Sequence, residues 1–274
     1  MSAIERALSR AAQSLKGVSD TPRLDAELLM AAALGIGRDR LLLAPPHGRV
    51  PDNFRSMMER REAGEPVAYI TGQRAFWTID LEVGPGALIP RPDSETLMVA
   101  AVEHFSGRAG PAQILDLGTG PGTLLLAALD EWPRATGLGI DASPLALSYA
   151  QRNAERLGLA GRAALQLGDW ASGVRSRFDL VLCNPPYVAE GAATGPGVAE
   201  YEPPEALFAG SEGLDDYARL APQLGRLIAP GGLAAIEIGH DQADAVLALF
   251  DAHGLEGRLA FDLAGRPRAV LIAG

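Results

Sequence analysis

The most informative part of the sequence is a short central segment that reads Ile114-Leu115-Asp116-Leu117-Gly118-Thr119-Gly120-Pro121-Gly122. Its apolar first half predicts a buried strand, and the apolar residues that follow at Thr123–Glu131 predict a helix. Glycines between a strand and a helix let the backbone approach a ligand closely, and the first turn of the helix offers free N–H groups. The segment therefore predicts an α/β fold with a ligand site at the end of this strand.

Strands and helices alternate around and beyond this segment. The strand candidates are Gln113–Asp116, Thr136–Asp141, Ala163–Leu167, Phe178–Cys183, Leu233–Ile238, Arg258–Leu263 and Arg268–Ile272. The helix candidates between them are Thr123–Glu131, Pro144–Leu157, Leu214–Ile228 and Asp241–His253. This alternation predicts a seven-stranded, mostly parallel, Rossmann-like sheet covered by helices. Only Gly265-Arg266-Pro267 separates the last two strands, which predicts an antiparallel hairpin at the sheet edge.

The amino-terminal part of the chain has a different pattern. Apolar residues at helical spacing, with breaks at Gly35, Pro45-Pro46 and Gly64, predict a small bundle of four short helices. Residues 75–83 are rich in aromatic and β-branched residues and precede Gly84-Pro85-Gly86, which predicts a hairpin. We therefore expect three parts, namely a helical substrate-recognition domain (1–72), a hairpin linker (73–92) and an α/β catalytic domain (93–274).

Composition narrows the class of protein. The 274 residues are 47% hydrophobic and 21% charged, as in many globular enzymes. No apolar run reaches the ~18–20 residues of a membrane-spanning helix and no secretory signal is recognisable, so we expect a cytoplasmic protein. Cys183 is the only cysteine, which excludes an intramolecular disulfide and a cysteine-based zinc cluster, and we expect no metal site. The net charge of −10 argues against a nucleic-acid substrate, because phosphate contacts usually need a basic face.

The residues around the glycines indicate which ligand to expect. A dinucleotide fingerprint needs a glycine at the position of Thr123, so that ligand class does not fit. Asp116 would repel a pyrophosphate, but it suits the ammonium and sulfonium groups of S-adenosylmethionine. Asp141 ends the next strand, where an acid can accept hydrogen bonds from both ribose hydroxyls. We therefore predict an S-adenosylmethionine site, with S-adenosylhomocysteine as the product.

Four further residues are candidates for the walls of the site. Trp170 follows the third strand and can stack on adenine while Asp169 meets its amino group, although a tryptophan packed at a strand end is the alternative. Phe76 in the hairpin can wall the substrate pocket or serve as an interdomain core contact. Arg91 lies between two prolines, and a structural ion pair is favoured there over a role in the pocket.

The second informative segment is Asn184-Pro185-Pro186-Tyr187, at the end of the fourth strand, where ligands bind in such folds. An NH₂ group on an sp² carbon is a poor nucleophile because its lone pair is delocalised. The Asn184 side-chain oxygen and the Pro185 carbonyl can accept its two hydrogens, and these bonds strengthen as positive charge develops on nitrogen. The prolines stiffen the loop, and Tyr187 offers a face for the planar acceptor group. The segment predicts catalysis of methyl transfer to such a nitrogen.

Together these segments resemble the protein-(glutamine-N(5)) methyltransferases that modify peptide chain release factors. The resemblance covers nearly the whole chain and is carried by Arg23–Leu29, Gly64–Gly72, Leu88–Glu95, Asp116–Gly120, Asn184–Tyr187, Tyr201–Pro203, Glu237–His240 and Asp262–Arg266. It implies a class I methyltransferase whose substrate is the glutamine of a Gly-Gly-Gln loop in the release factor. It implies cofactor contacts by Gly118, Thr119, Gly120, Pro121, Gly122, Asp141, Trp170 and Asn184, and substrate contacts by Asn184, Pro185, Pro186 and Tyr187.

One position departs from the family pattern. Relatives more often have a small polar residue where this chain has Pro121, so a side-chain hydroxyl contact to the cofactor is lost there, while backbone contacts survive.

Other functions use similar loops. The same reaction on a ribosomal-protein glutamine is the nearest alternative, and the helical domain favours release factors. An adenine-N(6) or guanine-N(2) methyltransferase acting on nucleic acid can also use Asn-Pro-Pro-Tyr, but the net charge opposes it. A cofactor-binding module without activity would not need this loop. We expect a monomer whose partners are release factors, with no membrane and no direct nucleic-acid substrate.

Overall fold

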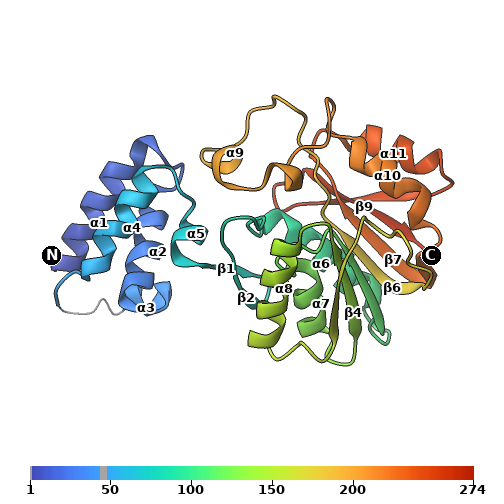
Figure 1. The fold of residues 1–274 in the computed structure, drawn as a ribbon, viewed down its shortest axis with the longest axis horizontal. Helices are drawn as coiled ribbons and strands as arrows, with labels where there is room; N and C mark the ends of the chain where they lie inside the picture. Colours follow the sequence, from blue (N-terminus) through green and yellow to red (C-terminus); the bar gives the residue numbers. More distant parts are fainter. Residues whose placement is uncertain (1, 44–47) are drawn as a thin grey trace. The chain divides into compact units, whose positions relative to one another are not determined.

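The protein is described by a computed structural model that covers residues 2–43 and 48–274, so the expected helix break at Pro45-Pro46 lies outside the described residues. The chain forms two compact units. The first joins the amino-terminal residues up to Gln73 with Thr194–Glu202, and the second joins Arg74–Ala193 with Pro203–Gly274. Each unit is described on its own below, with its elements labelled in Figure 1.

The first unit is a small helical bundle. Its helices are α1 (Ala3–Ser14), α2 (Pro22–Leu34), α3 (Arg38–Leu43), α4 (Asp52–Glu62) and α5 (Val67–Thr71), with a 3₁₀ turn at Leu15–Gly17 and the short α9 (Val198–Tyr201). Ser2 begins α1 with a capping box, because its hydroxyl accepts the Glu5 N–H and the Glu5 side chain accepts the Ser2 N–H. The buried apolar faces of α1, α2 and α4 meet in one core that includes Leu8, Leu29 and Phe54.

Two acidic residues of α2, Asp25 and Glu27, form ion pairs within this bundle. Arg61 Nε donates to Asp25 Oδ2 at 2.8 Å, and both side chains are about nine-tenths buried. The guanidinium of Arg61 also donates to backbone carbonyls, including that of Val18. Glu27 accepts hydrogen bonds from Arg23 and Arg38 on the same unit. A buried ion pair that loses one partner is strongly destabilising, so these acids fix how the helices of the bundle pack.

The late segment around α9 is fastened to the end of α4. The Tyr201 hydroxyl donates to the Ala63 carbonyl at 3.1 Å. Gly197 has φ +78°, and a side chain there would collide with the carbonyl of Gly64. This is why residues 194–202 belong to the helical unit although some 120 residues separate them from it.

The second unit begins with the hairpin of β1 (Gln73–Phe76) and β2 (Ile79–Glu82) and contains a seven-stranded sheet in the order β5-β4-β3-β6-β7-β9-β8. These strands are β3 (Gln113–Leu117), β4 (Thr136–Asp141), β5 (Ala163–Leu167), β6 (Phe178–Cys183), β7 (Ile228–Glu237), β8 (Gly257–Phe261) and β9 (Pro267–Ala273). The first five are parallel, while β9 is antiparallel to both β7 and β8. The expected seven-stranded, mostly parallel sheet with an antiparallel hairpin is therefore confirmed.

Helices cover both faces of this sheet (Figure 1). The helices of the unit are α6 (Glu95–Phe105), α7 (Thr123–Glu131), α8 (Pro144–Arg156), α10 (Asp215–Leu224) and α11 (Ala243–Asp251). α10 and α11 pack on the face that carries Leu115, Val181 and Ile236, and α6, α7 and α8 pack on the other. Because successive side chains of a strand point to opposite faces, strands that are apolar throughout suit a sheet buried on both sides.

The strand order fixes where a ligand can bind. The chain leaves β3 toward β4 and β5, then returns to the other side of β3 to form β6 and β7. The carboxyl ends of β3 and β6 therefore flank the point where the direction of winding reverses, which is the usual ligand crevice of such sheets. Both informative sequence segments lie at this point.

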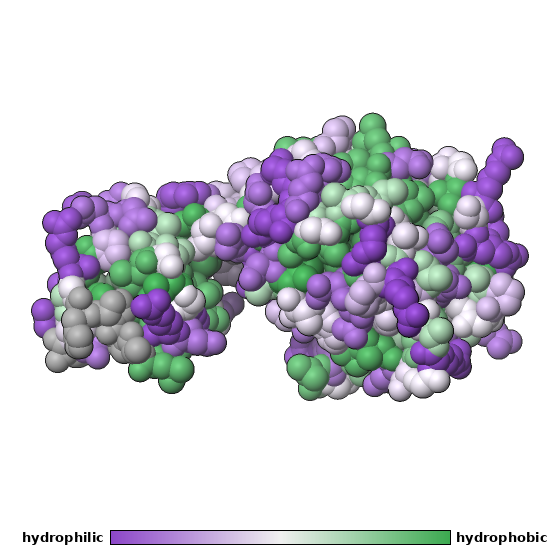
Figure 2. All heavy atoms as spheres, turned by 90° about the horizontal axis from the view of Figure 1, so that it is seen from below, coloured by the Kyte–Doolittle hydropathy of each residue, from purple (hydrophilic) through white to green (hydrophobic). Residues whose placement is uncertain are grey.

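One face of the molecular surface is shown in Figure 2. Hydrophilic residues cover much of the face in Figure 2, with hydrophobic residues in small patches between them. Within the described ranges, no helix is both long and apolar enough to span a bilayer.

Candidate active site

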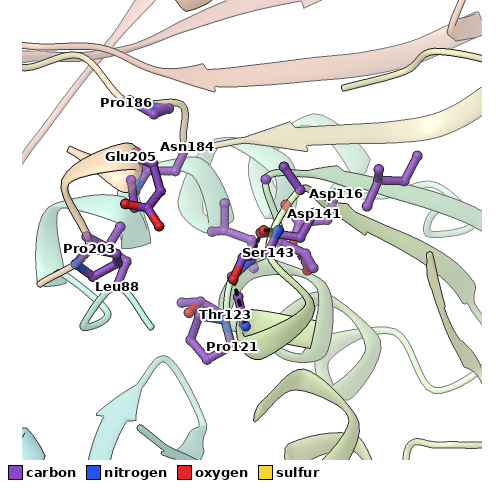
Figure 3. A pocket seen from close by; sticks show the side chains of 18 of the residues that line it. Leu88, Asp116, Pro121, Thr123, Asp141, Ser143, Asn184, Pro186, Pro203 and Glu205 are labelled. Atoms are coloured by element: carbon purple, nitrogen blue, oxygen red, sulfur yellow. Dashed lines mark hydrogen bonds between the residues drawn. The ribbon is translucent and has the colours of Figure 1, made fainter. Parts of the chain in front are cut away.

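A cavity of about 490 Å³ lies at the carboxyl ends of β3, β4 and β6, within the size range of small-molecule sites. Figure 3 shows Asp116 and Asp141 on one side of it and Asn184, Pro186 and Glu205 on the other. Of the residues expected from sequence, the cavity is lined by Arg91, Asp116, Gly118, Thr119, Gly120, Pro121, Asp141, Asp169, Trp170, Asn184 and Pro186. Segments far apart in the chain thus meet at one place.

The glycine-rich turn is held by the strands on which it rests. The N–H groups of Gly118 and Thr119 both donate to the Ile140 carbonyl, at 2.9 and 3.0 Å. Gly118 and Gly120 have φ values of +70° and +57°, a region that residues with a Cβ seldom adopt. The glycines are therefore required by the turn itself, and their position brings bare backbone to the cavity.

Asp116 lies beneath this turn and is almost fully buried. Its Oδ2 accepts hydrogen bonds from the Thr119 hydroxyl at 2.6 Å and the Leu125 N–H at 3.0 Å. Its Oδ1 has no hydrogen-bond partner among the described residues. Burial raises the pKa of Asp116 to about 7, against these two hydrogen bonds, and the nearby Asp141 raises it further. An orphaned buried carboxylate oxygen at a cavity wall suits a cationic ligand group.

Asp141, at the end of β4, holds the turn from the other side. Its Oδ2 accepts the Gly120 N–H at 2.7 Å, and its Oδ1 accepts the Ser143 N–H at 2.8 Å. Burial raises the pKa of Asp141, while these backbone hydrogen bonds oppose the shift. A carboxylate has about four acceptor positions, so Asp141 can still accept from a ligand hydroxyl while it holds the turn.

Asp169 and Trp170 form another wall, together with two residues that the sequence did not indicate. Trp170 has φ +47°, a strained value for a tryptophan, and its Nε1 donates to Asp216 Oδ1 at 3.2 Å. Arg219 pairs with both Asp169 and Asp216. Asp216 and Arg219 lie on α10, about fifty residues further along the chain, so only the fold brings them here. The expected contact of Asp169 with adenine would have to compete with its ion pair to Arg219.

The Asn184 loop begins where β6 ends. Asn184 Nδ2 donates to the Ser94 hydroxyl at 3.1 Å. The Tyr187 hydroxyl donates to Glu237 Oε1 at 3.3 Å, and Gln242 Nε2 donates to the Tyr187 carbonyl at 3.0 Å. The loop is therefore fixed at both ends by side chains from other elements, which supports the stiffness expected from its two prolines.

Four expected site residues do not line the cavity. Phe76 is 2% exposed within the β1–β2 hairpin. Tyr187 points to Glu237 and packs on the core of the sheet. Pro185 is buried, and Gly122 forms the N-cap of α7 beside Leu126. Conversely, the lining includes Leu88, Pro203 and Glu205, which lie in or near resembling segments but were not singled out.

The charges of the cavity fit S-adenosylmethionine. Its walls carry five carboxylates, Asp116, Asp141, Asp169, Glu205 and Asp216, against two guanidiniums, Arg91 and Arg219. Such a surplus attracts the ammonium and sulfonium of this cofactor and repels phosphates. Asp116 would face a cationic end, Asp141 the ribose hydroxyls, and Trp170 the adenine.

We expect cofactor affinity to rise with pH through about 7, because of Asp116. The free protein holds this carboxyl with a pKa of about 7, and a bound cation favours the ionised form. Below pH 7 binding must first remove the proton, so the association constant at pH 6 is expected to be lower than at pH 8 by as much as roughly tenfold. Isothermal calorimetry across this range measures the change.

Asp116→Asn is the matched control, because the amide keeps the size of the side chain and does not titrate. Its affinity should be lower at pH 8 and nearly constant between pH 6 and 8, apart from the titration of the ligand's own amine, which both proteins share. An equal pH dependence in the two proteins would contradict the assignment to Asp116.

Comparisons with known proteins show which proteins the chain is similar to. Residues 6–72 match the family model described as PrmC N-terminal domain, and residues 94–200 match that described as Methyltransferase small domain. A release factor glutamine methyltransferase of Rhodospirillum rubrum is 44% identical, over 97% of this chain and 83% of its own length. One from Caulobacter vibrioides is 43% identical, over 92% of this chain and 89% of its own. A solved methyltransferase from Pyrococcus furiosus shares the fold, with 18% identity and a TM-score of 0.54 over 81% of this chain and 98% of that one.

Proposed function

The chain belongs to the release factor glutamine methyltransferase family, and on that premise we propose that it methylates the side-chain amide nitrogen of the Gly-Gly-Gln glutamine in peptide chain release factors. The methyl donor is S-adenosylmethionine. We further propose that the enzyme acts as a monomer in the cytoplasm and that no nucleic acid is its direct substrate.

The position of Asn184 supports this proposal most directly. It lies on the wall of the cavity opposite Asp116 and Asp141 (Figure 3), at the end of a strand adjacent to β3. Asp116 and Asp141 would hold the cofactor, and the methyl group that it supplies would be transferred within this cavity. The side chain that an amide NH₂ needs as an acceptor is thus across the cavity from the residues that suit the donor.

We propose separate tasks for the residues of the site. When bound, S-adenosylmethionine supplies an electrophilic methyl group. Asn184 Oδ1 and the Pro185 carbonyl hold the two hydrogens of the glutamine amide, so that its nitrogen faces this group. Both acceptors also favour the pyramidal nitrogen with a freed lone pair, and they stabilise the positive charge that develops there. Pro186 and Arg91, which line the cavity, would bound the space for the glutamine side chain.

Mass spectrometry of candidate substrates tests the proposed function. The protein is incubated with purified release factors and S-adenosylmethionine that carries a labelled methyl group, and the digested factors are then searched for labelled glutamine. We expect one labelled methyl group on the Gly-Gly-Gln glutamine. Parallel incubations with ribosomal proteins and with RNA test the alternatives, and label found only there would contradict the proposal.

The helical unit is proposed to dock the release factor, because the second unit contains every residue assigned to chemistry. A chain that starts at Ala75 should still bind S-adenosylmethionine, but its kcat/KM on the intact factor should fall by at least about tenfold, the loss that ~1.4 kcal/mol of binding energy represents. Calorimetry measures cofactor binding, and the labelled-methyl assay measures activity.

A short Gly-Gly-Gln peptide is the control for damage to the site. Removing the bundle also takes away Ala63 and Gly64, to which residues 194–202 are fastened, so circular dichroism must show a folded protein. Activity on the peptide should be similar with and without the bundle, since the peptide has no surface for it to dock. Undiminished activity of the shortened chain on the intact factor would refute docking by this unit.

A further inference from the structure

A row of polar side chains runs from Asn184 into the core behind the active site. Asn184 Nδ2 donates to Ser94 Oγ at 3.1 Å, and the Ser94 hydroxyl lies near the Glu237 carboxylate and lowers its pKa against the effect of burial. Ser94 is 2% exposed and Glu237 is fully buried, at the end of β7. Ser94 is also the N-cap residue of α6, yet its side chain makes no capping hydrogen bond. A serine that makes no capping hydrogen bond but accepts one from a distant side chain indicates a different task.

The chemistry of these groups fixes the direction of the chain. A carboxylate can only accept hydrogen bonds, and Glu237 Oε2 has no other partner among the described residues, so we infer that the single hydrogen of the Ser94 hydroxyl is drawn toward Glu237. The Ser94 oxygen is then left as an acceptor, and only the NH₂ side of the Asn184 amide can face it. The amide oxygen must therefore lie on the opposite side, and it has no hydrogen-bond partner within 2–43 and 48–274.

This orientation is the one that methyl transfer needs. An amide oxygen can accept a hydrogen from a substrate NH₂ group, whereas a flipped Asn184 would present its own NH₂ and could accept nothing. Rotation of the amide about its last bond changes the shape of the site very little, so packing alone would not select one orientation. The hydrogen-bond partner of the Asn184 NH₂ group, on the side away from the substrate, therefore has to select the orientation of the amide.

We propose that Ser94 and Glu237 are positioning residues, whose hydrogen-bonded chain keeps the Asn184 oxygen turned toward the nitrogen that is methylated. This inference rests on the proposed function, since it concerns the acceptor end of that reaction. The Tyr187 hydroxyl donates to the Glu237 carboxylate, so the other polar side chain of the Asn184–Tyr187 loop is anchored on Glu237 directly.

The charge of Glu237 is set by groups from every neighbouring element. Arg268 on β9 attracts it but is shared with Asp93 and Asp262, at 3.0 and 3.5 Å. Asp93 opposes ionisation, Cys183 on β6 and the Tyr217 side chain on α10 lie close, and the Tyr217 hydroxyl donates to the Glu237 carbonyl.

Burial is the largest influence and raises the pKa of Glu237 to about 7. Once protonated, Glu237 can donate to Ser94, which frees the serine hydrogen to attract the Asn184 oxygen away from the substrate.

The decisive experiment removes the serine hydroxyl with and without Asn184. We compare kcat and KM of the wild type, Ser94→Ala, Asn184→Ala and the double variant on an intact release factor at saturating S-adenosylmethionine. Ser94→Ala should lower kcat by up to about tenfold, the worth of one hydrogen bond, with KM and melting temperature little changed. In the Asn184→Ala background the same change should have almost no effect, because there is no amide left to orient.

The pH dependence of kcat and a control substitution of another serine complete the test. The wild-type kcat should rise with pH through about 7, since ionised Glu237 is the active form, and Glu237→Gln should abolish this rise. Saturating cofactor keeps Asp116 ionised, so that group does not contribute to the profile. Ser106→Ala, at the other end of α6, should leave kcat unchanged.

The outcomes separate the two proposals. If the wild type methylates the factor but Ser94→Ala is without effect, or lowers kcat equally in both backgrounds, the serine has no orienting role. A profile that Glu237→Gln leaves unchanged would exclude the carboxylate as the source of the pH dependence. An inactive wild type would overturn the proposed function and this inference together.

Discussion

Replacing Asp141 with alanine is expected to weaken S-adenosylmethionine binding by about a hundredfold or more. Two hydrogen bonds to a charged group, at ~1.5–3 kcal/mol each, amount to at least ~3 kcal/mol when both ribose hydroxyls lose their acceptor. The structure adds a second loss, because Asp141 also accepts the N–H groups of Gly120 and Ser143. Without the carboxylate, part of the glycine-rich turn must reorganise before it can receive a ligand.

Calorimetry with S-adenosylmethionine measures this loss of affinity, and two further variants serve as controls. Asp141→Asn keeps an acceptor oxygen and the shape of the side chain, so its affinity should lie between those of the wild type and the alanine variant. Asp251→Ala removes an exposed acid at the end of α11 and should bind as the wild type does. An Asp141→Ala protein with unchanged affinity and a normal melting temperature would show that the ribose is not held here.

The fold was predictable from sequence where burial imposes a pattern. Strands β3 and β6 are covered on both faces, so most of their residues are apolar and they stand out from the helices between them. The edge of the sheet was predictable only in part. The short turn at Gly265 predicts that β8 and β9 pair, but not that β9 inserts between β7 and β8. Strand order depends on long-range pairing, which no local pattern records.

Short elements and distant contacts were the other source of misses. The five residues of α5, Val67–Thr71, span too few turns to show a helical period, and no helix was predicted there within the expected helical domain. The grouping of residues 194–202 with the helical unit depends on a tyrosine hydroxyl and one glycine. Two such contacts leave no trace in composition or periodicity.

The residues of the site also fall into those that the sequence could locate and those that it could not. The acids at strand ends and the Asn184 loop could be located, because topology alone places the carboxyl ends of parallel strands along one edge. The partners behind them could not. Ser94, Glu237 and Arg268 belong to three segments far apart in the chain, and only the folded sheet places them behind Asn184 and Tyr187. The sequence indicated that these segments resemble those of the family, but not that their side chains contact the Asn184–Tyr187 loop.

Replacing Asn184 with alanine is expected to lower kcat on the release factor by about 10²–10³, or ~3–4 kcal/mol, as for other preorganised partners of a developing charge. The KM for the factor should change much less, because docking on the helical unit is unaffected. The hydrogen bond to the amide strengthens as the nitrogen becomes positive, so its loss falls mainly on the transition state. Single-turnover measurements with labelled S-adenosylmethionine record the chemical step directly.

Asn184→Asp separates acceptance of a hydrogen bond from the rest of the side chain. A carboxylate accepts with either oxygen, so it should keep contact with the substrate NH₂ and retain more activity than alanine. It cannot donate to Ser94, and it would compete with Glu237 for the serine hydrogen, so it should remain below the wild type. Its negative charge also attracts the sulfonium already in the ground state, which adds nothing to the rate of transfer.

We therefore expect kcat to decrease from the wild type to Asn184→Asp and further to Asn184→Ala. Cofactor affinity of all three proteins must be measured alongside, because Asn184 lies on the cavity wall and an altered binding constant could mimic a catalytic loss below saturation. Equal inactivity of aspartate and alanine at saturating cofactor would mean that something other than hydrogen-bond acceptance is the essential property. Undiminished turnover in Asn184→Ala would remove this loop from the chemistry, and with it the reason for a buried carboxylate behind it.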